Sequence, residues 1–271
     1  MATGSDQMMS TDVVVTRKCN HVLLITINRP RVLNCINRAV SEAIGAALET
    51  AETDPTVRVI VLTGAGDRAF CAGADLKALA NGEDIHPQGS RAHWGFAGYV
   101  DHPVSKPTIA AVNGFALGGG TELALASDLV IAADTAEFGL PEVRRGRIAA
   151  AGGAFRLAQQ IPRKVALEMA FTGGQIPAAR ALELGLVTRV VPQNQTLSAA
   201  LELADVIAAN APLAVQATKR IAGGITDGRV ERDAADWDRN GLEASRIRIS
   251  EDAMEGARAF IEKRTPNWTG R

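Results

Sequence analysis

Three consecutive glycines mark residues 113–122 (NGFALGGGTE), between an apolar run and a stretch of helical character. Inside a helix each glycine costs about 1 kcal/mol relative to alanine, so helix propensity does not explain them. They suit a helix N-terminus, where unpaired backbone N–H groups can bind an anionic oxygen at close range. The alternative is a tight strand-to-helix turn in which glycine serves packing alone. The spacing favours an anion site around Gly119 and leaves the turn as the competing interpretation.

Glu122 lies three residues after Gly119, so in a helix the two residues share one face, one turn apart. A carboxylate at this place could act as a general base beside the bound oxygen. It could equally cap the positive end of the helix. Helical periodicity does not separate these two roles.

A second loop of small residues occurs at residues 68–76 (RAFCAGADL), after a predicted strand. Ala72, Gly73 and Ala74 are small enough for a ligand to touch the backbone, and Asp75 suits the N-cap of a following helix. Two backbone N–H groups from separate loops are what an oxyanion hole for a thioester enolate requires. The two small-residue loops could supply such a pair of N–H groups.

Residues 64–69 (GAGDRA) formally fit the dinucleotide-binding pattern GxGxx(G/A). That pattern also needs a helix that opens at once and an acidic residue about 20 positions later, at the end of the next strand. Glu83 and Asp84 occupy this offset but lie in a polar loop, and residues 71–73 (CAG) interrupt any helix. The sequence therefore argues against a dehydrogenase.

Strand-like and helical segments alternate through the first two thirds of the chain. Apolar, β-branched runs predict strands at residues 22–28, 57–63, 108–112 and 129–132, and residues 38–52 predict a helix that Asp54 and Pro55 end. This alternation predicts an α/β fold with mostly parallel strands. The polar residues 80–91 predict a loop of a kind that is often mobile and functional.

The pattern becomes helical from about residue 197, with helices predicted at residues 197–209, 212–221, 231–248 and 251–263. We therefore divide the chain into a flexible N-terminus (1–10), a core that carries the site (11–196) and a helical C-terminal region (197–271). The C-terminal region is expected to pack on the core or to reach across to a partner.

Charge and composition exclude several classes of protein. The 29 basic and 30 acidic residues leave a net charge of -1, which gives no pull toward nucleic acid or an anionic membrane. The four histidines lack metal-ligand spacing, and the three cysteines are expected to be small buried residues in a reducing compartment. No signal peptide and no apolar run of about 20 residues is visible, so we expect a soluble cytoplasmic protein.

Three ordered motifs, RAFCAGADL, AVNGFALGGGTELALASD and FGLPE, resemble those of the crotonase superfamily, the enoyl-CoA hydratase/isomerase family. The resemblance runs over residues 14–263 and implies a spiral of ββα turns with a helical C-terminal part, assembled as a homotrimer or a dimer of trimers. It implies an acyl-CoA thioester as substrate, with no metal and no separate cofactor. The implied oxyanion donors are the N–H groups of Ala74 and Gly119, and the implied carboxylates are Glu122 and Glu142.

Possession of both glutamates favours an enoyl-CoA hydratase, because family members with other chemistry commonly lack one of them. The resemblance leaves open an enoyl-CoA isomerase, a thioester hydrolase and an acyl-CoA-binding protein without turnover. The tail, residues 250–271, also resembles the crotonobetainyl-CoA (carnitinyl-CoA) hydratase branch. The residues expected to touch the substrate or its CoA part are Arg31, Val32, Leu33, Ala72, Gly73, Asp75, Leu76, Lys77, Gly118, Phe260 and Lys263.

The sequence departs from the family pattern after Glu142. Ala149 and Ala150 replace a Pro-Gly pair, and their methyl groups are expected to narrow the acyl pocket or to shift Glu142. Arg144, Arg145 and Arg147 are interpreted as a solvated or subunit-facing patch, with recognition of a carboxylated acyl chain as the lesser hypothesis. The aromatic residues of 93–99 are interpreted as core anchors of a mobile lid rather than as pocket lining: His93, Trp94, Phe96 and Tyr99.

Overall fold

The larger of two main sheets contains six strands in the order β1-β2-β3-β5-β7-β10, in a computed structural model that describes residues 12–271. β1 and β2 pair antiparallel, and the remaining neighbours pair parallel. The strands are β1 (Val14–Cys19), β2 (Val22–Ile27), β3 (Val59–Gly64), β5 (Thr108–Val112), β7 (Leu129–Ala133) and β10 (Arg189–Val191). The flexible terminus predicted for residues 1–10 lies outside the described residues.

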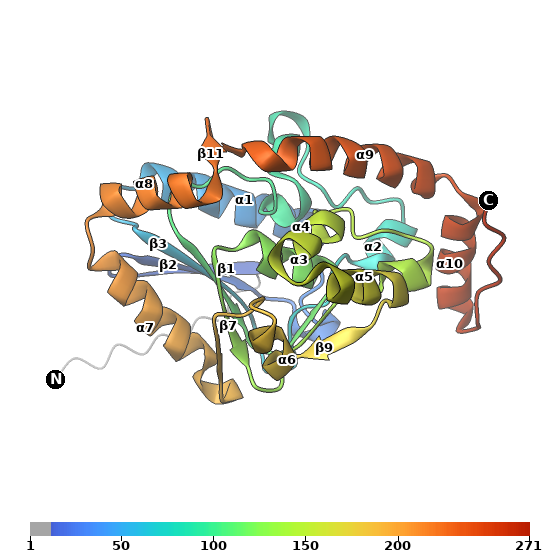
Figure 1. Cartoon of the computed structure of the whole chain (residues 1–271), viewed down its shortest axis with the longest axis horizontal. Coiled ribbons are helices and arrows are strands. Elements are labelled where there is room, and N and C mark those ends of the chain that lie inside the picture. Colours follow the sequence, from blue (N-terminus) through green and yellow to red (C-terminus); the bar gives the residue numbers. More distant parts are fainter. Residues whose placement is uncertain (1–11) are drawn as a thin grey trace.

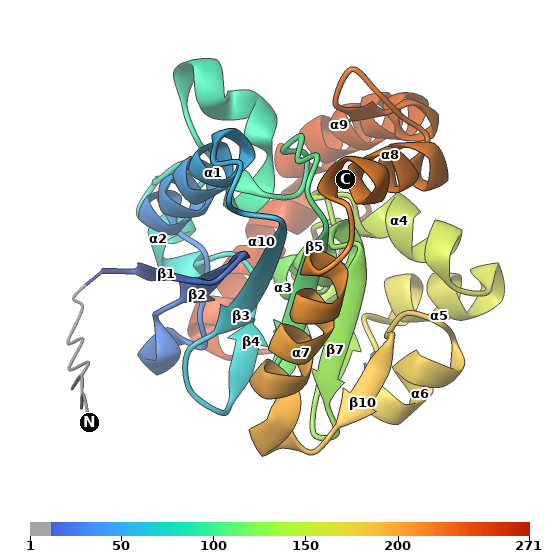
Figure 2. The same cartoon turned by 90° about the vertical axis from the view of Figure 1, so that its left-hand side faces the viewer.

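A smaller sheet has the order β4-β6-β8-β9, with the first three strands parallel and β9 antiparallel to β8. Its strands are β4 (Ala69–Cys71), β6 (Phe115–Leu117), β8 (Glu137–Gly139) and β9 (Gln175–Pro177). Each of β4, β6 and β8 directly follows a strand of the larger sheet, and α2 (Leu76–Ala80) and α3 (Gly119–Ala126) follow β4 and β6 (Figures 1 and 2). This is the predicted ββα spiral, so the predicted fold class is confirmed.

Helices cover both faces of the larger sheet, and its central strand is buried on both. In β3, Val59 and Val61 pack toward α7 (Thr196–Ala208), whereas Ile60 and Leu62 belong to the main core with α1 (Arg38–Thr53). Figure 2 shows α7 lying along the sheet beside β5 and β7. The apolar run of β3 lacks alternation because a parallel strand between two helical layers has no polar side.

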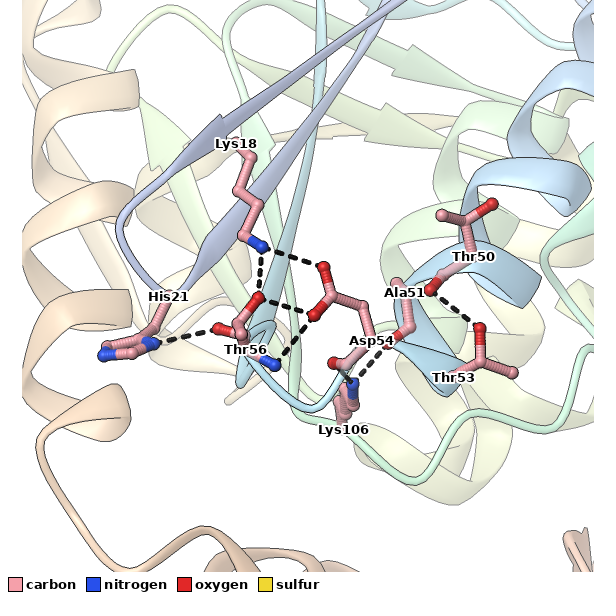
Figure 3. A network of polar contacts seen from close by, with 8 residues as sticks. All are labelled: Lys18, His21, Thr50, Ala51, Thr53, Asp54, Thr56 and Lys106. Atoms are coloured by element: carbon pink, nitrogen blue, oxygen red, sulfur yellow. Dashed lines mark hydrogen bonds and ion pairs between the residues drawn. The ribbon is translucent and has the colours of Figure 1, made fainter.

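The C-terminus of α1 is closed by a buried lysine (Figure 3). The ammonium group of Lys106 donates to the backbone oxygens of Ala51 and Asp54, at a helix end where a cation is favoured. Asp54 also accepts a 2.8 Å ion-pair contact from Lys18 on β1. These contacts fasten the end of α1 to the first strand and to the segment before β5.

The predicted elements agree with the structure except at their ends. The strand predicted from residue 57 begins at Val59, because the N–H of Val57 closes a turn onto Asp54. The helix predicted from residue 231 begins at Ala234, after a 3-10 turn over Glu231–Asp233. Of the three cysteines, Cys71 is buried as expected, and Cys19 and Cys35 are half-buried.

The helical C-terminal region comprises α7, α8 (Pro212–Gly223), α9 (Ala234–Arg248) and α10 (Glu251–Glu262), with a short hairpin of β11 (Ile225–Thr226) and β12 (Arg229–Val230). Figure 1 shows α9 running across the top of the molecule and α10 turning down at its end. Within residues 12–271, no single helix is long and apolar enough to cross a membrane. One sharply bent pair of helices, which includes α7 and α8, has the length and the apolar composition of a membrane span, and nothing beyond these two properties favours one.

Candidate active site

The predicted site forms at the carboxyl ends of β4, β6 and β8. Because these strands are parallel neighbours, the loops that follow them meet at one edge of the smaller sheet. The N–H of Gly118 donates to the carbonyl oxygen of Gly139 at 2.9 Å, which joins the second loop to the third. A Cβ atom at Gly73 would lie 3.2 Å from the backbone nitrogen of Gly119, so the first loop is in contact with the second.

Two backbone N–H groups are directed away from their own elements at this meeting point. Gly119 is the first residue of α3, so its N–H has no acceptor within the helix. Ala74 forms a parallel bridge with Ile36, in which Gly73 and Asp75 make the hydrogen bonds. The N–H of Ala74 therefore points to the side opposite Ile36. The structure thus brings the two predicted oxyanion donors onto adjacent loops.

Glu122 lies in the first turn of α3 and is 4% exposed. Its Oε1 accepts a 2.9 Å hydrogen bond from the N–H of Gly153, the first residue of α4 (Gly153–Gln160). This partner comes from another helix, so the carboxylate is not a local cap of its own helix, which was the alternative in the sequence. A fixed, buried carboxylate beside the glycine turn is suited to act as an acid or base.

Glu142 reaches the same place from η4 (Pro141–Arg145), the 3-10 turn after β8. A Cβ atom at Gly118 would lie 2.7 Å from its Oε1, so the carboxylate lies against the glycine turn that begins α3. Its Oε2 is buried and has no hydrogen-bond partner in the described part of the chain. A buried carboxyl oxygen without a partner indicates a group kept for a ligand or for proton transfer.

Both carboxyl groups have raised pKa values. Burial raises the pKa of Glu122, and the negative charge of Glu142 raises it further. Burial also raises the pKa of Glu142. Because burial and the charge of the neighbouring carboxylate both disfavour ionisation, the pair retains a proton at a pH where an ordinary carboxyl has lost its own. The pair can therefore offer one proton donor and one acceptor.

The raised pKa of Glu122 predicts that the free energy of unfolding of the protein decreases as pH rises. The unfolded chain releases this proton near the ordinary glutamate pKa of about 4.3, whereas the folded protein retains it to higher pH. Ionisation therefore favours the unfolded state between that pH and the raised pKa. Glu122→Gln should raise the Tm by a few degrees at pH 9 and less at pH 5. Thermal unfolding at both pH values measures this, with Glu137→Gln as control; an equal shift at both would contradict it.

An aromatic side chain covers the predicted anion site at Gly119. A Cβ atom at Gly119 would overlap the ring of Phe96, which lies in η3 (Phe96–Gly98) and is buried. Trp94 and Tyr99 are also buried, which confirms their interpretation as core anchors, whereas His93 is exposed. Phe96 therefore packs in the main core and also contacts Gly119 with its ring.

The expected CoA contacts of the N-terminal half gather beside the first loop. The N–H of Ala72 donates to the carbonyl oxygen of Leu33 at 3.0 Å, which joins the segment of Arg31 and Val32 to the oxyanion loop. Asp75 caps α2 as predicted and pairs with Arg29 at 2.9 Å. Leu76 and Lys77 are exposed on α2. Through these contacts the segment of Leu33 and the start of α2 both lie beside the loop of Ala72 and Ala74.

Phe260 and Lys263 lie elsewhere, on α10 and directly after it. The guanidinium group of Arg145 lies 4.2 Å from the centre of the Phe260 ring in the same chain. The role of these two residues toward CoA bound by a neighbouring subunit stays a prediction.

The departures from the family pattern lie close to Glu122. A Cβ atom at Gly153 would lie 2.9 Å from the Ala149 methyl group and equally far from Oε1 of Glu122. Ala149 thus adds bulk at this carboxylate, whereas Ala150 is exposed. Arg144 and Arg145 are exposed and contact the ends of α5 (Arg163–Thr172) and α10, as expected for a solvated patch.

A cavity of about 720 Å³ lies between the core and the segment from α8 to α9. Neither glutamate lines it. Arg156 and Trp237 do, and both also lie close to Gly152, the residue before the partner of Glu122. The predicted site at the two glutamates therefore lies outside this cavity.

Sequence comparison identifies the family of the chain. The sequence model of the enoyl-CoA hydratase/isomerase family matches residues 17–271. The chain belongs to the enoyl-CoA hydratase/isomerase family. The prediction of a hydratase of the crotonase superfamily is thereby confirmed at the level of the family.

Several members of this family are close to the chain over nearly its whole length. A carnitinyl-CoA dehydratase of Proteus mirabilis (strain HI4320) is 43% identical over 253 residues, which are 92% of this chain and 95% of the relative. The structure of EchA1_1 from Mycobacterium paratuberculosis is 56% identical with a TM-score of 0.93. That of carnitinyl-CoA hydratase from Mycobacterium avium is 54% identical with a TM-score of 0.94. Each structural match covers 97% of this chain and 100% of the other.

Proposed function

We propose that this enzyme adds water reversibly to a trans-2-enoyl-CoA to give a 3-hydroxyacyl-CoA. The observation that supports it is the pair Glu122 and Glu142, two carboxyl groups with raised pKa values beside one glycine turn, of which Glu122 is buried and Glu142 has a buried Oε2. A hydratase needs both a proton donor and a proton acceptor at the reacting carbons, and one shared proton supplies them.

The thioester oxygen lies between the N–H groups of Ala74 and Gly119. These donors stabilise the negative charge that develops on the oxygen as the enolate forms. Their hydrogen bonds to this charged oxygen are stronger than those to the neutral thioester oxygen of the bound substrate, so they lower the barrier. The dipole of α3 adds to this effect because its positive end is at Gly119.

Glu122 and Glu142 bind one water molecule between them. Its oxygen attacks C3 while a proton is delivered to C2, and the reverse sequence removes water. We assign orientation and activation of the water to Glu122, which Gly153 holds in place, and proton transfer to Glu142. The opposite assignment uses the same geometry.

The substrate to test first is the crotonobetainyl-CoA and carnitinyl-CoA pair. A relative at 43% identity is named a carnitinyl-CoA dehydratase, and one at 54% identity is named a carnitinyl-CoA hydratase. The CoA part lies along Arg31, Val32 and Leu33, with Lys77 nearby.

A cytoplasmic homotrimer or dimer of trimers is part of the proposal. Exposed apolar side chains on α8 and α10, among them Ile221 and Ile261, favour association of the subunits.

A panel of enoyl-CoA esters, including crotonyl-CoA and crotonobetainyl-CoA, tests the proposal through ultraviolet loss of the conjugated thioester. We expect loss with at least one ester and formation of its 3-hydroxyacyl-CoA. Isomerised 3-enoyl-CoA or free CoA as the product would assign an isomerase or a thioester hydrolase instead. Tight binding with no product from any ester would assign a binding protein.

A further inference from the structure

The two glutamates are held in different ways. Glu122 is fixed by a 2.9 Å hydrogen bond from Gly153, which belongs to a separate helix. Glu142 has a buried Oε2 without a partner among residues 12–271, and the backbone N–H that favours its charged form is its own. That N–H moves together with the residue. The position of the Glu142 carboxylate is therefore set by the backbone of η4.

The outer side of η4 is packed against α10 at a contact that has no room for a side chain. A Cβ atom at Gly256 of α10 would overlap the carbonyl group of Arg145 and lie 3.0 Å from the nitrogen of Gly146. A Cβ atom at Gly146 would in turn overlap the backbone of Asp252. Two backbones touch here, so a displacement of α10 is transmitted directly to η4.

Further contacts keep α10 at this place. The Arg145 guanidinium lies over the Phe260 ring, which fastens the far end of the helix to the same 3-10 turn. The tail folds back along α10, where Arg264 pairs with Glu255 through both carboxylate oxygens. The N–H groups of Thr269 and Gly270 donate to Asp252 at 2.7 and 3.1 Å. The chain terminus thus fastens the helix that supports η4.

We infer that α10 is the positioning element for Glu142, acting through the contact of Gly256 with Arg145 and Gly146. This inference rests on the proposed function, because it assigns α10 a part in the proton transfer assigned to Glu142. A shift of about 1 Å in a reacting group can lower a rate by about 100-fold, so a small separation of α10 from η4 is enough to matter.

Gly256→Ala tests the inference, because its methyl group must push the two backbones apart. We expect kcat to fall by about 10-fold or more. Any change in KM reports the accompanying displacement of Phe260 and Lys263, the expected CoA contacts on and after the same helix. Gly241→Ala is the matched control: Gly241 lies in α9 with no atom within 4 Å of an added Cβ, so kcat should stay within about twofold. Phe260 is unsuitable as a probe because it is also an expected CoA contact.

The decisive measurement repeats the substitution in the Glu142→Gln background under single-turnover conditions. If Gly256 acts through Glu142, the added methyl group lowers the residual rate by less than about twofold. An equal loss in both backgrounds, or no loss in the wild-type background, would overturn the inference. Wild-type activity of Glu142→Gln would instead refute the proposed function. If Gly256→Ala does not fold by circular dichroism, Glu255→Gln takes its place in the same cycle, because it weakens the pair with Arg264 that fastens α10.

Discussion

Glu122→Gln and Glu142→Gln are each expected to lower kcat for hydration by at least about 100-fold, because general acid–base catalysis contributes roughly 10²–10⁴. Glutamine preserves the shape of the side chain, and at position 122 its oxygen can still accept the Gly153 hydrogen bond. What it removes is the exchangeable proton of the pair. Binding of the thioester depends on the backbone donors and the CoA contacts, so the affinity for the product should change little.

Rates with the preferred enoyl-CoA ester, together with product affinity by calorimetry, measure these effects. Glu137→Gln on β8 is the control, since it is the same chemical change in the strand that precedes η4. The two substitutions should be far from additive, because each alone disables the shared water. Full activity in both single variants would rule out the carboxylate mechanism.

Helix starts and caps can be predicted from the sequence where all the residues that form them lie in one short segment. Gly119 and Glu122 lie within one helical turn, so glycine placement alone predicts a helix that begins at Gly119 with Glu122 in its first turn, as the structure has it. Asp75 was likewise recognisable as an N-cap from the residues beside it. The parallel fold follows from the alternation of strands and helices, whereas the spiral of ββα turns is implied only by the family resemblance, and the division into two sheets is seen only in the structure.

Contacts between distant segments were beyond local rules. Glu142 joins the site because β6 and β8 pair in a register that sets Leu117 against Gly139. The hydrogen bond from Gly153 to Glu122 spans 31 positions, and the Phe96 ring reaches Gly119 from a different segment of the chain. Nothing in the residues around Gly146 or Gly256 predicts that these two glycines lie at the same contact between η4 and α10. Such features depend on register and packing, which a single sequence does not specify.

Gly119→Ala is expected to lower kcat/KM by about 100- to 1000-fold, the cost of losing one oxyanion donor. The backbone at Gly119 is helical, so alanine is not strained there by its dihedral angles. Its methyl group, however, would overlap the Phe96 ring and lie 3.3 Å from Cα of Gly73. Either the ring moves into the space of the thioester oxygen, or the two donor loops separate.

A second substitution distinguishes these two outcomes. Phe96→Leu shortens the side chain that the new methyl group meets, so Gly119→Ala/Phe96→Leu should recover part of the lost kcat/KM if the ring is the obstacle. If the separation of the loops from Gly73 dominates, the double variant stays as slow as Gly119→Ala alone. Thermal unfolding shows whether either variant is merely destabilised, and Gly241→Ala reports the effect of a helical alanine without contacts. Unchanged kcat/KM in Gly119→Ala would contradict the placement of the thioester oxygen at this N–H group, because the added methyl group must displace either the Phe96 ring or the loop of Gly73.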